Sequence, residues 1–523
     1  MIRSSLNLRI GGEGDKRAFV RGLVDVLVIH NLRRTSASGA RGAVTFRVGS
    51  LMVLGGFFLA GCAVGRDYRR PELNAPARWN RLDDLSRPEM PAGSAGDLSE
   101  WWRNLDDPLL SDLVKEALLA SPDLRMAQAR LREARARRVV TGSAQYPDVS
   151  ASASGSRNQS TGNTAAGVTG NQLSAGFDAS WELDVFGGVR RSVEAAKADL
   201  ESSEASLNDT HVSLVAEVAR DYFEVRSLQL RLGIARSNLA SQSETLQLTG
   251  FRAQAGLVSS QDVEQAKSNR ELTMAQIPSL KASLAEAEYR LDVLLGKAPG
   301  TLHTGLDTGG SLPAVHSRIA VGIPADTLRR RPDVRAAERN LAAATARVGV
   351  AEAARYPSFK LSGSIGVDAL VQSGFENGFG SVYSLLGGIT APIFYGGRLR
   401  AQVEVQDAVR EQALVAYEQA VLSSLQEVEN ALVSLVASSE RADALTRAVE
   451  AARNAALLAR QRYRAGMIDF QSVLDTERSV FSIEDSLAST RADEVFTLIR
   501  LYKALGGGWS PQADTRPADK DTP

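Results

Sequence analysis

Apolar residues recur every seven positions along two long stretches of this chain, residues 188–254 and 398–464. One such series in each stretch is Val193, Leu200, Leu207, Leu214 and Leu414, Val421, Val428, Leu435. This spacing is typical of helices that pack along a seam. A helix of this length spans about 100 Å, at roughly 1.5 Å per residue. The pattern therefore predicts two helices that are much longer than those of a globular domain.

Two shorter segments are predicted to be helices that run back beside the long ones. Residues 260–296 follow a turn at Gly256, and residues 325–355 follow a stretch rich in glycine and proline, where loop signals cluster. Together the two segments are nearly as long as one long helix. We therefore expect them to stack end to end and to run antiparallel beside it.

A second pattern, strict alternation of apolar and polar residues, predicts four strands near 146–158, 171–186, 356–371 and 381–395. A period of two places the apolar and polar sets on opposite faces of a sheet. Carboxylates fall on the polar face, which predicts an acidic lining with a mild preference for cations. These carboxylates are Asp178, Glu182, Asp184 and Asp368.

Two interpretations of these strands are open, half-buried strands of a soluble sandwich and strands of a membrane barrel. Three features favour the barrel: an export signal around residues 51–62, an almost wholly apolar strand face and tyrosines at the strand ends. The tyrosines are Tyr146, Tyr356, Tyr383 and Tyr395. Four strands cannot close a barrel, and an open edge leaves backbone groups unpaired in lipid. Three chains would supply twelve strands, an even number in the known range. The predicted fold class is therefore an α+β membrane protein with long helices and a trimeric 12-stranded β-barrel.

The chain is built from a tandem repeat. The segment that begins at Pro122 matches the segment that begins at Pro332, an offset of 210 residues. The same offset relates Gly256 to Gly466 and Leu295 to Leu505. One unit used twice therefore organises the chain. We assign the first repeat to 122–300 and the second repeat to 325–508. Residues 301–324 connect the two repeats, and we call this segment the waist connection.

The N-terminal region has the pattern of an export signal. Residues 51–60 are apolar but too few to span a bilayer as a helix, which takes roughly 20 residues, and Arg41 and Arg47 precede them. The ending Leu59-Ala60-Gly61-Cys62 resembles a bacterial lipobox, which predicts lipidation of Cys62. The alternative is a free cysteine buried in a helix. We expect 1–61 to be a signal peptide with an over-long start, 62–121 a lipid-anchored segment with part of the waist, and 509–523 a disordered tail.

Composition narrows the function further. The formal net charge is zero, with 61 basic and 61 acidic residues, so no electrostatic footprint for nucleic acid exists. The chain contains one cysteine and four scattered histidines, and it has neither a P-loop nor a GxSxG motif. We therefore expect no enzymatic activity and no cofactor or metal.

Several motifs together resemble the TolC/OprM outer-membrane factors, in the NodT-type lipoprotein subgroup that serves RND efflux pumps. They are CAVGRDYRRPE, RRRPDVRAAERNLAAATARVGVAEAARYPSFKLSG, APIFYGGRLR, YRAGMIDFQSVLDTERS and LYKALGGGW. The resemblance covers about 62–510 and implies a homotrimer with a 12-stranded barrel in the outer membrane. It also implies a periplasmic α-barrel of twelve long helices, with mixed structure around its waist. It further implies a passive conduit for small molecules such as drugs, joined by a periplasmic adaptor to an inner-membrane RND pump.

The resemblance also implies a gate at the periplasmic tip. Tyr463, Arg464 and Asp475 match the family's closing ring, although both charges would otherwise read as ordinary exposed helix residues. The turns between the helices predict the periplasmic tip at Gly256, Ser259, Gly466 and Asp469. The resemblance implies that the adaptor contacts this tip.

Two other functions stay open on the sequence alone. The same fold could serve a type I system that secretes polypeptides. The chain could also be a lipid-anchored periplasmic coiled coil that carries soluble β modules.

Overall fold

The computed structural model describes residues 63–72, 76–80, 98–160, 168–306, 312–313, 324–372 and 380–510. The chain divides into two units, Met1–Gly61 and Cys62–Pro523, and every described residue belongs to the second. The predicted signal peptide, Cys62 and the tail from residue 511 lie outside the described residues.

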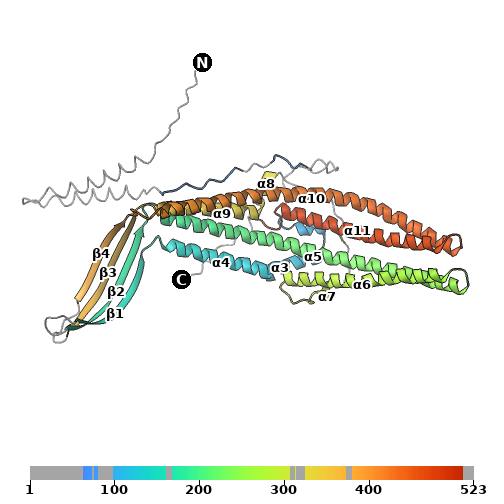
Figure 1. Ribbon diagram of the computed structural model, residues 1–523, viewed down its shortest axis with the longest axis horizontal. Coiled ribbons are helices and arrows are strands. Elements are labelled where there is room, and N and C mark those ends of the chain that lie inside the picture. The colour runs from blue at the N-terminus through green and yellow to red at the C-terminus, as the bar shows by residue number, and fades with distance from the viewer. Residues whose placement is uncertain are drawn as a thin grey trace, which may run out of the picture. The chain divides into compact units, whose positions relative to one another are not determined.

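Two helices of 67 residues form the frame of the second unit, α5 (Gly188–Gln254) and α10 (Arg398–Arg464). Their bounds are those predicted from the heptad pattern. Each is followed by a return helix of 35 residues, α6 (Ser260–Leu294) after α5 and α11 (Phe470–Ala504) after α10. The two helical hairpins turn at one end of this unit and the strands lie at the other end (Figure 1).

Near the strands, two shorter helices join the long ones, α4 (Pro122–Ser143) and α9 (Pro332–Ala353). Contacts between neighbours give the order α4, α5, α9, α10 on the side of the strands and α6, α5, α11, α10 on the side of the hairpin turns. The unit is therefore a layer of four helical columns (Figure 1).

The stacking partner predicted for 260–296 was wrong. At the end of α6, Gly296 has a φ of 69°, and a Cβ on it would lie 2.8 Å from the carbonyl oxygen of Ala120. Helix α6 therefore continues the column of α4. Gly506, just beyond the end of α11, has a φ of 73°, and a Cβ on it would lie 3.5 Å from the Cα of Arg331, which precedes α9. Length alone could not tell which short helix continues which.

The helix predicted over 325–355 is in fact two helices, α8 (Pro324–Arg330) and α9. They are separated at Arg331, because the residue before a proline is disfavoured in the α conformation. Arg331 is buried, and its guanidinium donates to the carbonyl oxygen of Ala504 (3.1 Å) and pairs with Asp333 and Glu427 (both 2.7 Å). The break thus joins α9 to both helices of the second hairpin.

A compact core lies at the waist, the level at which the short helices of each column meet end to end, α4 with α6 and α9 with α11. The 3-10 helix η2 (Trp101–Leu105) and helix α3 (Pro108–Ala120) cover it, and a short helix α7 (His303–Leu306) follows the first repeat. Trp101 is buried and stacks on Tyr502 with ring centroids 4.9 Å apart. No helix among the described residues is long and apolar enough to cross a membrane.

The strands form one antiparallel sheet in the order β1, β2, β3, β4. Their bounds are Asp148–Ser160, Val168–Leu183, Ser358–Gln372 and Gly380–Thr390, within a few residues of the prediction. The sheet order follows the helix order, since α4 leads into β1 and β4 leads into α10. Strands β1 and β4 are the two edges, and neither has a second partner among the described residues.

Candidate functional site: the sheet and the hairpin tips

The sheet has one apolar and one polar face, as the alternation predicts. On the apolar face Phe177 lies opposite Ala151 and Ile365, and Ile365 lies opposite Tyr383. These side chains are exposed rather than packed in a core; Phe177, Ile365, Tyr383 and Leu385 are 60%, 64%, 84% and 79% exposed. An apolar surface of this kind needs a covering that the described residues do not provide.

The polar face carries serines and three of the four predicted carboxylates. Asp178 accepts a hydrogen bond from Ser152 Oγ (2.9 Å), and Asp368 lies opposite Ser174. Glu182 lies opposite Lys360, so this acid faces a basic residue in the neighbouring strand. The face is therefore acidic at Asp178 and Asp368 and closer to neutral at Glu182.

Asp184 has a different place from the one predicted. It follows the last residue of β2, and its carboxylate accepts hydrogen bonds from the backbone N–H groups of Val189 (3.1 Å) and Arg190 (2.8 Å). Such bonds satisfy amide groups that the first turn of a helix leaves free. Asp184 is thus committed to the start of α5 and does not belong to the row of strand carboxylates.

At the opposite end of the unit, the two hairpins turn in the same way. Gly256 and Gly466 have φ values of 73° and 74°, a left-handed conformation that glycine adopts without strain. The N–H of Leu257 donates to Arg252 O, and the N–H of Met467 donates to Arg462 O, both at 2.9 Å. Both residues after the glycines are exposed, 66% for Leu257 and 67% for Met467.

The return helices begin with the same two residue types in exchanged positions. Ser259 caps α6 and pairs with Asp262, whereas Asp469 caps α11 and pairs with Ser472. Hydrogen bonds from Ser472 lower the pKa of Asp469. The first turn therefore has an acid too, three residues after the position that corresponds to Asp469, and the capping residues of both tips are engaged with their own helices.

Tyr463 lies between the two hairpins rather than on the surface. Its side chain is 3% exposed, and its ring centroid is 5.5 Å from that of Phe470 and 4.4 Å from the guanidinium carbon of Arg252. Arg252 also donates a hydrogen bond to the carbonyl oxygen of Tyr463. The repeat makes Arg252 the counterpart of Arg462, but the sequence does not reveal that it bridges α5 to α10.

Arg464 and Asp475 are both exposed, and the structure does not bring them together with Tyr463 inside one chain. Asp475 accepts a hydrogen bond from Gln471 Nε2 (2.9 Å) on its own helix. A closing ring built from these residues would therefore need side chains of neighbouring copies.

A buried carboxylate two residues beyond Asp475 on α11, which the sequence patterns did not reveal, links the two hairpins. Glu477 is 2% exposed, and its Oε1 accepts hydrogen bonds from Thr245 of α5 (2.7 Å) and from Arg460 of α10 (3.0 Å). Its other oxygen is buried without a partner in the described residues. Burial raises the pKa of Glu477, against the opposing effects of Thr245 and Arg460.

Replacing Glu477 by glutamine is expected to weaken the pH dependence of stability. Because the native pKa is raised, the contribution of Glu477 is fully present below its ordinary pKa of 4.5 and is lost as pH rises through the native pKa. At neutral pH the glutamine variant should melt at the same temperature or a few degrees higher. Thermal unfolding followed by circular dichroism from acid to neutral pH checks this, and a slope equal to that of the wild type would contradict it.

The N-terminal segment 63–72 is clamped across the layer near the strands. The buried guanidinium of Arg191 donates to the carbonyl oxygens of Val64 (3.3 Å) and Gly65 (3.2 Å) and to Asp67 (2.7 Å). The N–H of Val64 donates to the carbonyl oxygen of Phe186, just beyond β2 (3.0 Å). The chain that follows Cys62 is thus held at the junction of strands and helices.

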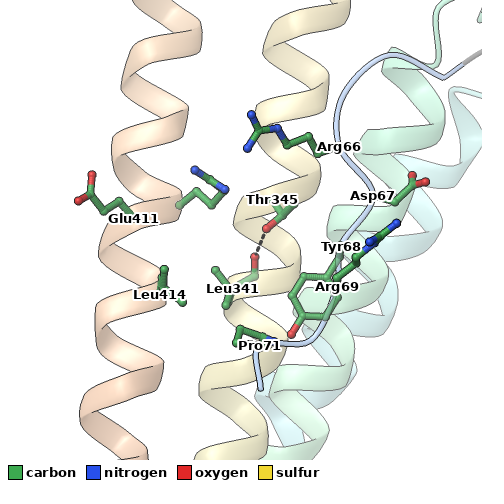
Figure 2. Close-up of a pocket in the computed structure, with 10 residues that line it drawn as sticks. Arg66, Asp67, Tyr68, Arg69, Pro71, Leu341, Thr345, Glu411 and Leu414 are labelled. Atoms are coloured by element: carbon green, nitrogen blue, oxygen red, sulfur yellow. Dashed lines mark hydrogen bonds between the residues drawn. The ribbon is translucent and has the colours of Figure 1, made fainter. Parts of the chain in front are cut away.

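A cavity of about 710 Å³ lies between this segment, α9 and α10. Tyr68 lies beside the part of α9 that carries Leu341 and Thr345, and Pro71 follows it, as Figure 2 shows. The hydroxyl of Tyr68 donates to Glu338 (2.8 Å). Within the described residues, no group of three or more histidine, cysteine or acidic side chains is placed to hold a metal ion.

The chain matches the family described as outer membrane efflux protein over residues 113–297 and 323–507. It is 33% identical over 461 residues to Nodulation protein T of Rhizobium leguminosarum bv. trifolii, covering 87% of this chain and 96% of that protein. It is 34% identical over 425 residues to the pyoverdine export outer membrane protein OpmQ of Pseudomonas putida, covering 80% and 89%.

Solved structures agree with this relationship. The outer-membrane channel OprN is 39% identical and superposes with a TM-score of 0.79 over 86% of this chain and 100% of that one. The open state of the MtrE outer membrane channel of Neisseria gonorrhoeae is 30% identical, with a TM-score of 0.72 over 86% and 99%. This chain therefore belongs to the outer membrane efflux protein family and is an outer-membrane efflux channel.

Proposed function

We propose that three copies of this chain form a passive conduit in which twelve strands close a barrel and twelve helical columns form a periplasmic tunnel. The observation that carries this proposal is a four-stranded sheet with an exposed apolar face and two edges that no other described strand pairs with. Free edges cannot persist in hydrocarbon, so β4 of one copy pairs with β1 of the next. With the apolar faces toward lipid, the polar faces line the pore.

The conduit is the outer component of a tripartite RND efflux pump. Relatives named as components of such systems support this, among them the probable efflux pump outer membrane protein TtgC of Pseudomonas putida, 32% identical over 462 residues. Energy for transport comes from the inner-membrane pump, and a periplasmic adaptor contacts the tips around Gly256 and Gly466. The chain itself carries out no enzymatic reaction.

Small molecules are the cargo that the relatives favour over polypeptides. Their names include pyoverdine export, toluene efflux and cation efflux, and none of these three names mentions protein secretion. The proposal therefore sets aside the type I secretion alternative, as well as a periplasmic coiled coil with soluble β modules.

Conductance in planar bilayers tests the conduit. Purified protein should insert as single channels of uniform conductance, and cells that lack it should become sensitive to an exported compound and recover with the wild-type gene. A membrane-bound protein that never conducts would overturn the proposal.

We propose that Cys62 carries the lipid anchor. Support comes from its position directly before the segment that Arg191 holds at the junction of strands and helices, where the chain is to meet the membrane surface. Acyl chains contribute about 0.8 kcal/mol per buried methylene, which assists sorting, while the barrel supplies permanent insertion. Mass spectrometry of the mature N-terminus tests this, and an unmodified thiol at residue 62 would refute it.

The pore should prefer cations mildly. Asp178 and Asp368 face the proposed lumen, whereas Glu182 has Lys360 opposite it, so the net acidic field is small. In a salt gradient, the reversal potential should indicate cation selectivity of about two- to fivefold, which the Asp178→Asn, Asp368→Asn double variant should remove. Anion selectivity of the wild type would contradict this placement.

A further inference from the structure

We propose that neighbouring copies pack α4 against α10 in the register that α9 and α5 use within one chain, with Arg132 and Glu411 as the charged contact between copies. The inference rests on the proposed ring of copies and names its interface. The two helices are the outer columns of the layer, at the same edges as β1 and β4 (Figure 1). A ring that joins β4 to β1 therefore brings α10 of one copy beside α4 of the next.

The repeat supplies a template for this contact. At the offset of 210 residues, α4 corresponds to α9 and α10 corresponds to α5. Helices α5 and α9 pack on each other within the chain, whereas α10 and α4 each leave the corresponding face open. The contact between copies is thus the counterpart of a contact that the structure already contains.

Burial on α10 differs from burial on α5 at the positions that would face the neighbouring copy. The most exposed apolar side chains in this part of α10 are Val405, Val415 and Leu422, at 58%, 54% and 66%. Their counterparts on α5, which face α9 or the core, are Ala195, Ala205 and Val212, at 5%, 1% and 3%. The exposed row on α10 is therefore a packing surface that lacks its partner.

Helix α4 shows the same difference from α9. Ala342, Ala343 and Ala346 of α9 are 5%, 0% and 1% exposed. Their counterparts Arg132, Glu133 and Ala136 are exposed. Glu133 already has a partner, Arg137 of its own helix, at 2.7 Å, so it adds no net charge to the seam.

Side-chain volumes are exchanged between the two contacts. Within the chain, Arg191 packs on Gly349, and a Cβ built on Gly349 would lie 3.0 Å from Arg191 Cγ. The counterparts are Ala401 and Val139, so the contact between copies sets a small side chain against a medium-sized one. The contact within the chain sets the large side chain of Arg191 against Gly349, which has no side chain. Arg191 is needed to hold segment 63–72, a task that its counterpart does not have.

Charge also fits the two surfaces to each other. Helix α4 contains six arginines and two acids, whereas residues 401–430 of α10 contain six acids and one arginine. Glu411 is the counterpart of Glu201, which binds Arg339 of α9 at 3.0 Å. Its carboxylate points away from α9 (Figure 2).

The arginine that meets Glu411 lies one turn from the template position. The counterpart of Arg339 is Ala129, which carries no charge, but Arg132 lies three residues further on the same exposed face. Three residues are about 4.5 Å along a helix, within the reach of a guanidinium. Neither Arg132 nor Glu411 has an ion-pair partner within the described part of the chain.

Disulfide trapping tests the register. The variant Val139→Cys, Ala401→Cys places two thiols at the counterparts of Gly349 and Arg191. A Cβ on Gly349 would lie 3.0 Å from Arg191 Cγ, which puts the two Cβ atoms within about 4.5 Å, close enough for a disulfide. Mild oxidation in native membranes should link copies into a covalent trimer on a non-reducing gel. The control Met126→Cys, Ala401→Cys moves one thiol about 20 Å along α4 and should remain unlinked. The native Cys62 is common to both variants.

A non-specific amine crosslinker, applied in parallel, separates this inference from the proposed function. Trimers with both reagents support the register. Trimers with the crosslinker but no disulfide, or a disulfide only in the control, overturn the register and leave the trimer intact. Absence of trimers with either reagent overturns both.

Charge exchange tests the pair itself. Arg132→Glu or Glu411→Arg alone should lower the ratio of trimer to monomer in detergent about five- to tenfold, and the double exchange should restore most of it. Arg130→Glu is the matched control, because its counterpart Asn340 is exposed. Equal losses in the single and double variants would exclude the pair.

Discussion

Replacing Gly176 by valine should abolish assembly of the channel, lowering the assembled trimer in the outer membrane at least about tenfold. Gly176 lies directly opposite Gly366 in the pairing of β2 with β3. A Cβ on Gly176 would lie 2.8 Å from the carbonyl oxygen of Ile365 and 3.0 Å from Gly366 Cα. Both are backbone atoms, so the strands must separate to admit any side chain.

The reciprocal contact is equally close, because a Cβ on Gly366 would lie 2.7 Å from the carbonyl oxygen of Ala175. Separated strands lose ladder hydrogen bonds at mid-sheet, where lipid offers no replacement. Gly387→Val is the control, since no atom lies within 4 Å of a Cβ built there. Trimer levels should be compared on gels of unheated outer membranes. Wild-type levels of the Gly176 variant would show that this close approach is not required.

The second large effect is expected at the tip, where Asp475→Ala should raise single-channel conductance several-fold. Asp475 and Arg464 are exposed and unpaired with each other within the described chain, which leaves both available to neighbouring copies. Charge-assisted hydrogen bonds between copies would hold the tunnel end narrow, yet they would separate when an adaptor repacks the hairpins.

Gln471→Ala is the matched control for this gate. It removes the hydrogen bond that Asp475 accepts within its own helix but keeps the carboxylate, so conductance should stay at the wild-type value. If Asp475→Ala also conducts like the wild type, Asp475 is an ordinary exposed charge, whose pairing contributes only about 0.2 to 1 kcal/mol.

The long helices could be predicted to the residue because their signal is local. Apolar residues recur at heptad spacing along α5 and α10, and Gly256 and Gly466 mark their ends. The sheet followed equally from alternation, which also placed Asp178 and Asp368 on one face. Patterns of this kind depend on neighbours within a few residues.

Contacts between distant segments were beyond such patterns. The stacking of α6 on α4, the contact of Arg252 with Tyr463 and the burial of Glu477 join residues that are far apart along the chain. Asp184 fits the alternation as well as Asp178 does, yet the chain leaves the sheet one residue earlier. Only the three-dimensional structure separates a strand carboxylate from a helix cap.

The mass of the protein purified in mild detergent, measured by native mass spectrometry, decides between a ring of three copies and a self-contained chain. A complex of three chains is expected, because the described part of each chain forms a four-stranded sheet whose two edges have no partner within that part. A stable monomer that stays soluble without detergent would contradict it, since its apolar sheet face would then need no partner and no lipid.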